Sequence, residues 1–186
     1  GPFPDVAPPL DIDSIGLTNV VRGLNRGVDP GGNTIGSVTR FVIGVRLNQV
    51  ALDHERELSR LRWKVDAGAQ FVVTQPVFAP DRLRAFQERT SELSVPLVAG
   101  LRPLTSLREA EFLHNEVPGM VVPEWVRQRM REAGRRGHEA GVALAQELLQ
   151  AVYPRIAGAY IIPSFGRYDT VADILSGLPG LTPPSS

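Results

Sequence analysis

A glutamine ends an apolar stretch of this chain. The run "FVVTQPVF" (residues 71–78) starts with apolar and β-branched residues, typical of a strand buried on both faces, and then changes to Gln75 and Pro76. A side-chain amide offers a donor and an acceptor to a heterocyclic ligand. It can equally serve only the backbone groups at the strand end, so the residue by itself leaves both roles open.

Three charged residues form a second candidate group. Glu57, Arg60 and Lys64 are spaced i, i+3 and i+7 within the helix predicted over residues 53–69, so they share one face, away from its apolar residues. Nineteen of the twenty basic residues are arginine, and Lys64 is the only lysine, which singles it out. From spacing alone, the group is either a ligand-binding face or a solvated charged surface.

An alternation of strands and helices must position these residues. Apolar periodicity predicts strands at 40–47, 70–75, 95–101 and 158–165, and helices at 13–25, 53–69, 80–90, 106–117, 124–133, 138–152 and 168–177. Such alternation predicts parallel strands joined by right-handed crossovers. Ligands bind at the carboxyl ends of the strands in folds of this kind, which is where Gln75 stands.

The predicted fold class is α/β, with about four parallel strands and their helices. A complete (β/α)8 barrel usually needs ~250 residues. Four strands in 186 residues therefore predict the C-terminal half of a (β/α)8 TIM barrel. We expect this partial barrel to span residues 1–177, with its N-terminal half missing and a disordered tail at 178–186. A small open doubly wound sheet is the competing architecture.

Composition excludes several classes of function. Twenty basic and twenty acidic residues balance, so no nucleic-acid or membrane partner is indicated. There is no cysteine, and the three histidines, His54, His114 and His138, lack metal-ligand spacing, so no metal site is predicted. Without an apolar run of the ~20 residues that a membrane span needs, or a signal peptide, the chain is expected to be cytoplasmic. The glycines of "GGNTIG" (31–36) precede a strand, so they indicate a turn and not a phosphate loop.

Several motifs in one order resemble the methylenetetrahydrofolate reductase family. They are "DIDSIGL", "RWKVDAGAQFVVTQPVF", "NEVPGMVVPEW" and "PSFGRY", within a resemblance that runs from about Pro4 to Leu175. The likeness is strongest to bacterial forms fused behind a homocysteine S-methyltransferase domain, which carry a similar "LNRGVDPGGN" loop. The resemblance implies a flavin-containing barrel that takes hydride from NAD(P)H onto FAD and reduces 5,10-methylenetetrahydrofolate to 5-methyltetrahydrofolate. It also implies a homo-oligomeric parent protein.

The same resemblance implies roles for individual residues. Those expected to bind FAD are Ile12, Asp13, Glu57, Arg60, Trp63 and Lys64, with Lys64 near the phosphates. Asp13 can instead be only the N-cap of the first helix. Those expected to bind the folate substrate are Gln75, Glu109 and Arg167, and Leu113 is expected on the nicotinamide side.

The catalytic group of the family is not found in this chain. The resemblance implies that a glutamate at the end of the first barrel strand is the general acid, and this position precedes Gly1, so no catalytic residue is assigned. We therefore expect a segment of the reductase that is inactive alone. The alternative is a non-catalytic binding or oligomerisation module derived from the same barrel. A third possibility, an unrelated barrel enzyme with a phosphate site, has no motif here.

Overall fold

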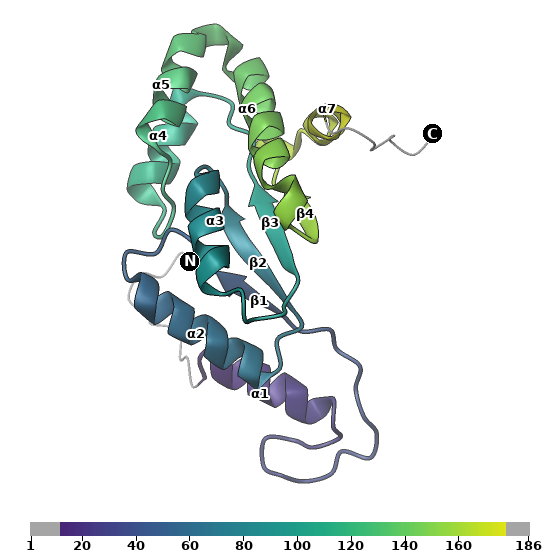
Figure 1. The fold of residues 1–186 in the computed structure, drawn as a ribbon. Coiled ribbons are helices and arrows are strands. Elements are labelled where there is room, and N and C mark those ends of the chain that lie inside the picture. Colours follow the sequence, from purple (N-terminus) through teal and green to yellow (C-terminus); the bar gives the residue numbers. More distant parts are fainter. Residues whose placement is uncertain (1–11, 178–186) are drawn as a thin grey trace, which may run out of the picture.

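The computed structural model describes residues 12–177, so the first eleven residues and the predicted tail at 178–186 lie outside the described part. Its four strands form one parallel sheet in chain order, as Figure 1 shows. They are β1 (Gly44–Leu47), β2 (Phe71–Pro76), β3 (Leu97–Leu101) and β4 (Gly158–Ile161). The predicted parallel alternation is confirmed.

Seven α-helices connect and flank the strands. They are α1 (Ser14–Leu24), α2 (His54–Ala67), α3 (Pro80–Arg89), α4 (Leu107–Glu116), α5 (Glu124–Ala133), α6 (Gly137–Val152) and α7 (Asp169–Ser176). Three 3₁₀ turns complete the described chain: η1 (Gly134–Arg136), η2 (Tyr153–Arg155) and η3 (Ser164–Gly166). Figure 1 shows α1 and α2 side by side at one end of the molecule and α4 to α6 gathered at the other.

Local sequence signals fix the ends of α2, the helix that carries the charged face. The side chain of Asp53 accepts a hydrogen bond from the Arg56 amide at 2.9 Å, which caps the first turn. Gly68 ends the helix with a φ of 119°, a left-handed conformation that a glycine adopts without strain. These two signals therefore hold Lys64 at a defined place relative to β1.

The helices pack on one face of the sheet. Val45 and Leu47 of β1 share a hydrophobic cluster with Leu58 and Leu61 of α2, and Leu101 of β3 joins a second cluster with α4 to α6. The clusters of residues 12–177 contain none of the strand residues that point to the opposite face. A doubly wound sheet has helices on both faces and a reversal of strand order, and this sheet has neither in its described part. The barrel prediction holds.

Aromatic rings cover part of the opposite face, which is the inner face of the half-barrel. A side chain added at Gly44 would meet the ring of Phe71, and one added at Gly100 would meet the ring of Tyr160. The Tyr160 hydroxyl donates a hydrogen bond of 2.7 Å to the Thr74 carbonyl. Each glycine thus makes room for a ring from the neighbouring strand.

Three predicted strands are shorter than expected, and the one predicted over 95–101 begins only at Leu97. The strand predicted over 40–47 begins only at Gly44, because the side chain of Gln70 takes the place of a partner strand and accepts from the Ile43 amide at 2.9 Å. The strand predicted over 158–165 ends at Ile161, since the chain then turns into η3 after Pro163. Within residues 12–177, every helix falls short of the length and hydrophobicity that a membrane span requires.

Candidate functional site

Gln75 lies at the carboxyl end of β2 and is buried, with 7% of its surface exposed. Gln49 follows β1 and is buried, and its side chain holds the Gln75 backbone through two hydrogen bonds. The Gln49 amide donates to the Gln75 carbonyl at 3.0 Å and accepts from the Gln75 N–H at 3.1 Å. Pro76 has no N–H, and the pairing of β2 with β3 shifts between Val73 and Pro76. The side-chain amide of Gln49 therefore continues the pairing of β2 on the β1 side. On the β3 side, where the pairing shifts, the Thr74 hydroxyl accepts a hydrogen bond from the Gly100 N–H at 2.9 Å.

The side chain of Gln75 faces Arg46 on the neighbouring strand. With its oxygen turned toward the guanidinium, the Gln75 amide accepts from Arg46 Nε at 2.9 Å and from Nη2. This pairing leaves the two N–H donors of the amide for a ligand. Tyr160 lies on the same inner face, where burial raises the pKa of its phenol while Arg46 acts in the opposite direction. The inner face thus presents neutral and cationic donors together.

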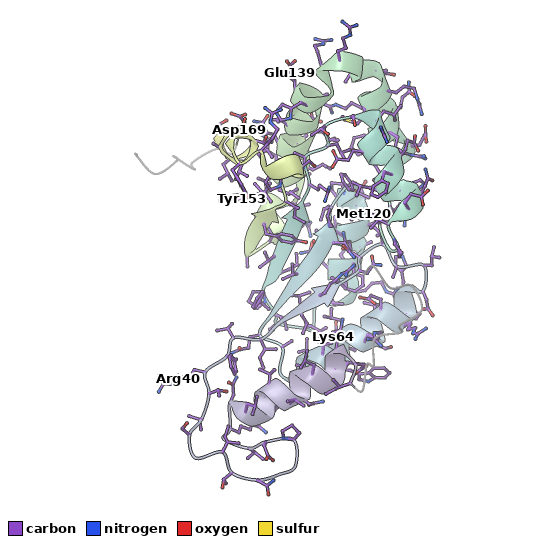
Figure 2. The ribbon with its side chains drawn as sticks, turned by 180° about the vertical axis from the view of Figure 1, so that it is seen from behind. Arg40, Lys64, Met120, Glu139, Tyr153 and Asp169 are labelled. Carbon is purple, nitrogen blue, oxygen red and sulfur yellow. The ribbon has the colours of Figure 1, made fainter. Side chains whose placement is uncertain are left out.

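A cavity of about 770 Å³ lies between α1 and β1. Its apolar wall comes from α1 and from the segment just before β1. Its polar lining consists of Ser14, Thr18, Arg46, Asn48, Glu57 and Lys64. In Figure 2, Lys64 lies beside the helix pair α1 and α2, at the opposite end of the molecule from Glu139.

Lys64 is a buried cation with few partners. Lys64 is 6% exposed, and its Nζ donates a hydrogen bond of 2.7 Å to the Arg46 carbonyl. Burial lowers the pKa of Lys64; Glu57 raises it, and the charges of Arg60 and Arg46 lower it further. An ammonium has three N–H donors, so Lys64 retains donors for an anion that enters the cavity.

The neighbouring charged residues are tied to the rim of the cavity. The Glu57 carboxylate accepts a hydrogen bond of 2.9 Å from the backbone N–H of Asn48. Arg60 donates to the Ser14 hydroxyl at 3.3 Å and lies 3.8 Å from the carboxylate of Asp13. Asp13 caps α1 by accepting from two backbone amides, so the N-cap role is confirmed and its flavin contact stays a prediction. The structure therefore brings these predicted residues together.

Glu109 lies in a separate polar cluster after β3. One carboxylate oxygen accepts from Arg102 Nε and Nη2 and from Ser164, and the other accepts from the amide and hydroxyl of Thr105. Burial, the largest single effect, raises the pKa of Glu109, but the hydrogen bonds from Ser164, Thr105 and Arg102 together outweigh it and lower the pKa. The cluster joins the loop after β3 to the turn after β4.

Comparison with known proteins identifies the family. The family model described as methylenetetrahydrofolate reductase matches residues 41–165, a segment that contains Lys64, Gln75 and Glu109. The chain belongs to the methylenetetrahydrofolate reductase family. Among solved structures, it is similar to an uncharacterized protein from Clostridium thermocellum, described as binding two copies of 5-methyl-5,6,7,8-tetrahydrofolic acid. The TM-score is 0.55 at 17% identity, and the match covers 74% of this chain and 52% of that chain, about half its length.

Other residues that the reductase resemblance selected lie apart from the cavity. Trp63 is 56% exposed and Ile12 is 42% exposed, and neither lines it. Arg167 is exposed and pairs with Asp169 at 3.3 Å. Leu113 is 3% exposed and packs in the core formed by α4 to α7, and its place on the nicotinamide side stays a prediction. The ligand contacts of Trp63, Ile12 and Arg167 stay predictions.

Two site residues at the strand ends, Gln49 and Arg46, were not predicted from the sequence. Gln49 holds the backbone of Gln75, and Arg46 holds its side chain. The available signal was the polar run "RLNQ" (46–49) directly after an apolar strand, at the edge where ligands bind. Within residues 12–177, no group of three or more histidine, aspartate or glutamate side chains is arranged to hold a metal ion.

Proposed function

We propose that this chain is a segment of a flavin-dependent oxidoreductase that reduces 5,10-methylenetetrahydrofolate to 5-methyltetrahydrofolate, with NAD(P)H as the donor. The observation that carries the proposal is the family match over residues 41–165, which includes Lys64, the β1 side of its cavity, and Gln75. The folate named for the similar Clostridium protein supports a folate as the small-molecule partner. The proposal also includes a fused methyltransferase domain and a homo-oligomeric parent, as the sequence resemblance implies.

The residues around the cavity suit FAD by chemical type. Lys64 is a buried cation with unused donors, which matches a pyrophosphate, and Glu57 is a carboxylate that can accept from ribose hydroxyls. The apolar wall beside them suits an aromatic ring system. When bound, FAD would supply the hydride-transfer chemistry, while the protein binds and orients the reactants.

Gln75 would recognise the pterin part of the folate. Its backbone is held by Gln49 and its amide oxygen by Arg46. Its N–H donors are therefore held in a fixed position, from which they can donate to an acceptor atom of the pterin. A donor whose rotamer is fixed in advance loses little entropy on binding. The sequence provides no general acid in the described residues, so the proton that opens the folate ring must come from another part of the protein or from solvent.

Flavin binding by Lys64 variants tests the proposal. The assay uses the complete gene product that contains this chain and follows FAD absorbance and fluorescence during titration. Lys64→Ala should weaken FAD binding about tenfold to a hundredfold, the scale of one charge-assisted hydrogen bond. Lys64→Arg should retain part of the affinity, although the two cations differ in geometry.

Arg56→Ala is the matched control, because Arg56 is an exposed cation on the same helix and does not line the cavity. It should leave FAD affinity unchanged. If Lys64→Ala binds FAD as well as the wild type, Lys64 has no part in flavin binding and only donates to the Arg46 carbonyl. If the wild type binds neither FAD nor a folate, the protein is better described as a non-catalytic module derived from the barrel.

A further inference from the structure

A buried carboxylate holds an arginine at the ligand-binding edge of the sheet. Arg102 follows β3 directly, and its guanidinium donates to one oxygen of Glu109 through Nε at 3.2 Å and Nη2 at 3.1 Å. The side chain of Glu109 is 9% exposed and that of Arg102 is 28% exposed. Removing a carboxylate from water is costly unless its oxygens accept several hydrogen bonds, and those of Glu109 accept five. Glu109 therefore has no free acceptor for a ligand.

The remaining donors of Arg102 are available. A guanidinium has five N–H groups, and the bonds to Glu109 use two of them. Among residues 12–177, no further acceptor for Arg102 is found. Leu97, Ala99 and Leu101 of β3 face the helices, so the alternation of the strand places Arg102 with Gly100 on the inner face.

The position of Arg102 relative to Gln75 fits an elongated ligand. Pro76 of β2 pairs with Gly100 of β3, so Arg102 lies three residue steps beyond Gln75 in the strand direction. At about 3.3 Å per residue, the two Cα atoms are separated by roughly 10 Å along the strands, toward the open end. A folate has this form, with a pterin at one end and a glutamyl group with two carboxylates at the other.

We infer that Arg102 is a substrate-binding residue for a carboxylate of the glutamyl tail of a folate, and that Glu109 is a positioning residue that orients it. The inference rests on the proposed function. The role expected for Glu109 changes from a substrate contact to a positioning residue, because Glu109 accepts hydrogen bonds only from the protein. Arginine suits this task because its planar guanidinium can bind one carboxylate with one side and another with the remaining side.

The test compares tetrahydrofolate with the primary amide of tetrahydropteroate, which keeps the pterin and the benzoyl amide and lacks both glutamyl carboxylates. Calorimetric titration of the complete gene product gives the affinity for each. Arg102→Ala should weaken tetrahydrofolate binding about tenfold to a hundredfold and change binding of the tetrahydropteroate amide less than about twofold. Arg102→Lys should recover part of the loss. Glu109→Gln should weaken tetrahydrofolate selectively but less, because the guanidinium stays and only its orientation is lost.

Arg108→Ala is the control, since Arg108 is an exposed arginine in the first turn of α4. It should alter neither affinity. If Arg102→Ala weakens both ligands equally, or neither, the inference is wrong and the cluster only connects two loops. If the wild type binds neither ligand, the proposed function fails and the inference fails with it. If the wild type binds both with affinities that Arg102→Ala leaves unchanged, the inference alone fails.

Discussion

Gln75→Glu separates a role in ligand binding from a role in folding. The substitution nearly preserves shape, and the backbone contacts with Gln49 do not depend on the side chain. The Gln75 amide oxygen already faces Arg46, so a carboxylate there gains a cationic partner. What the variant loses is the N–H pair, because an ionised carboxylate only accepts. We therefore expect little change in stability and a specific loss toward the pterin.

The magnitude follows from one lost hydrogen bond to a buried partner. Leaving such a partner unsatisfied costs roughly 1–3 kcal/mol, which corresponds to a factor of about ten to a hundred. Stability should change by less than about 1 kcal/mol, because the new pair with the exposed Arg46 is a partly solvated one. Stopped-flow absorbance of the flavin measures the two half-reactions separately in the complete gene product. Oxidation of reduced flavin by methylenetetrahydrofolate should slow at least about tenfold, while flavin reduction by NAD(P)H changes less.

Gln49→Leu provides the comparison. It keeps the approximate volume but removes both contacts with the Gln75 backbone, so it should lower stability and also slow the folate half-reaction. Equal slowing of both half-reactions by Gln75→Glu, or of neither, would refute the assignment of Gln75 to the folate. A fall in stability with an unchanged ratio of the two rates would show an amide that serves only the strand end.

Three other predictions concern stability. In denaturant titrations, the wild type should gain stability relative to Lys64→Met as pH rises toward about 10.4, the ordinary pKa of lysine, because burial lowers the pKa of Lys64 in the folded protein. Glu109→Gln should lower the free energy of unfolding by roughly 1.5–3 kcal/mol at pH 7. Because the pKa of Glu109 is lowered in the folded protein, the wild type loses this advantage as pH falls from about 4.3 through the folded pKa, whereas the variant does not titrate there. The melting temperatures of the two proteins should therefore converge at low pH. The chain expressed alone should self-associate in sedimentation experiments, because β1 and β4 are open edges of the described sheet and lie beside apolar grooves. A monodisperse monomer with a sharp thermal transition would contradict this prediction.

The sequence was sufficient to predict the order, type and direction of the elements. Periodicity and end signals such as Asp53 and Gly68 are local, and local signals determine where a helix starts and stops. The shortened first strand could not be predicted, because it depends on the side chain of Gln70 reaching Ile43 across 27 residues. The connection between Glu109 and Ser164 spans 55 residues and exists only once β3 and β4 pair. Single-sequence patterns contain no such distances.

Several of the residues that depart from these local patterns lie at the carboxyl-terminal edge of the sheet. Regular pairing of β2 with β3 fails between Val73 and Pro76, where the Thr74 hydroxyl accepts from the Gly100 N–H, and Gln49 holds the Gln75 backbone on the β1 side. Arg46 and Arg102 put cations on the inner-face side of strands whose other face is apolar. Each departure costs stability, and proteins retain such costs mainly where function requires them. Because these departures lie at the carboxyl-terminal edge, where ligands bind in barrels of this kind, we expect the ligand to bind at this edge.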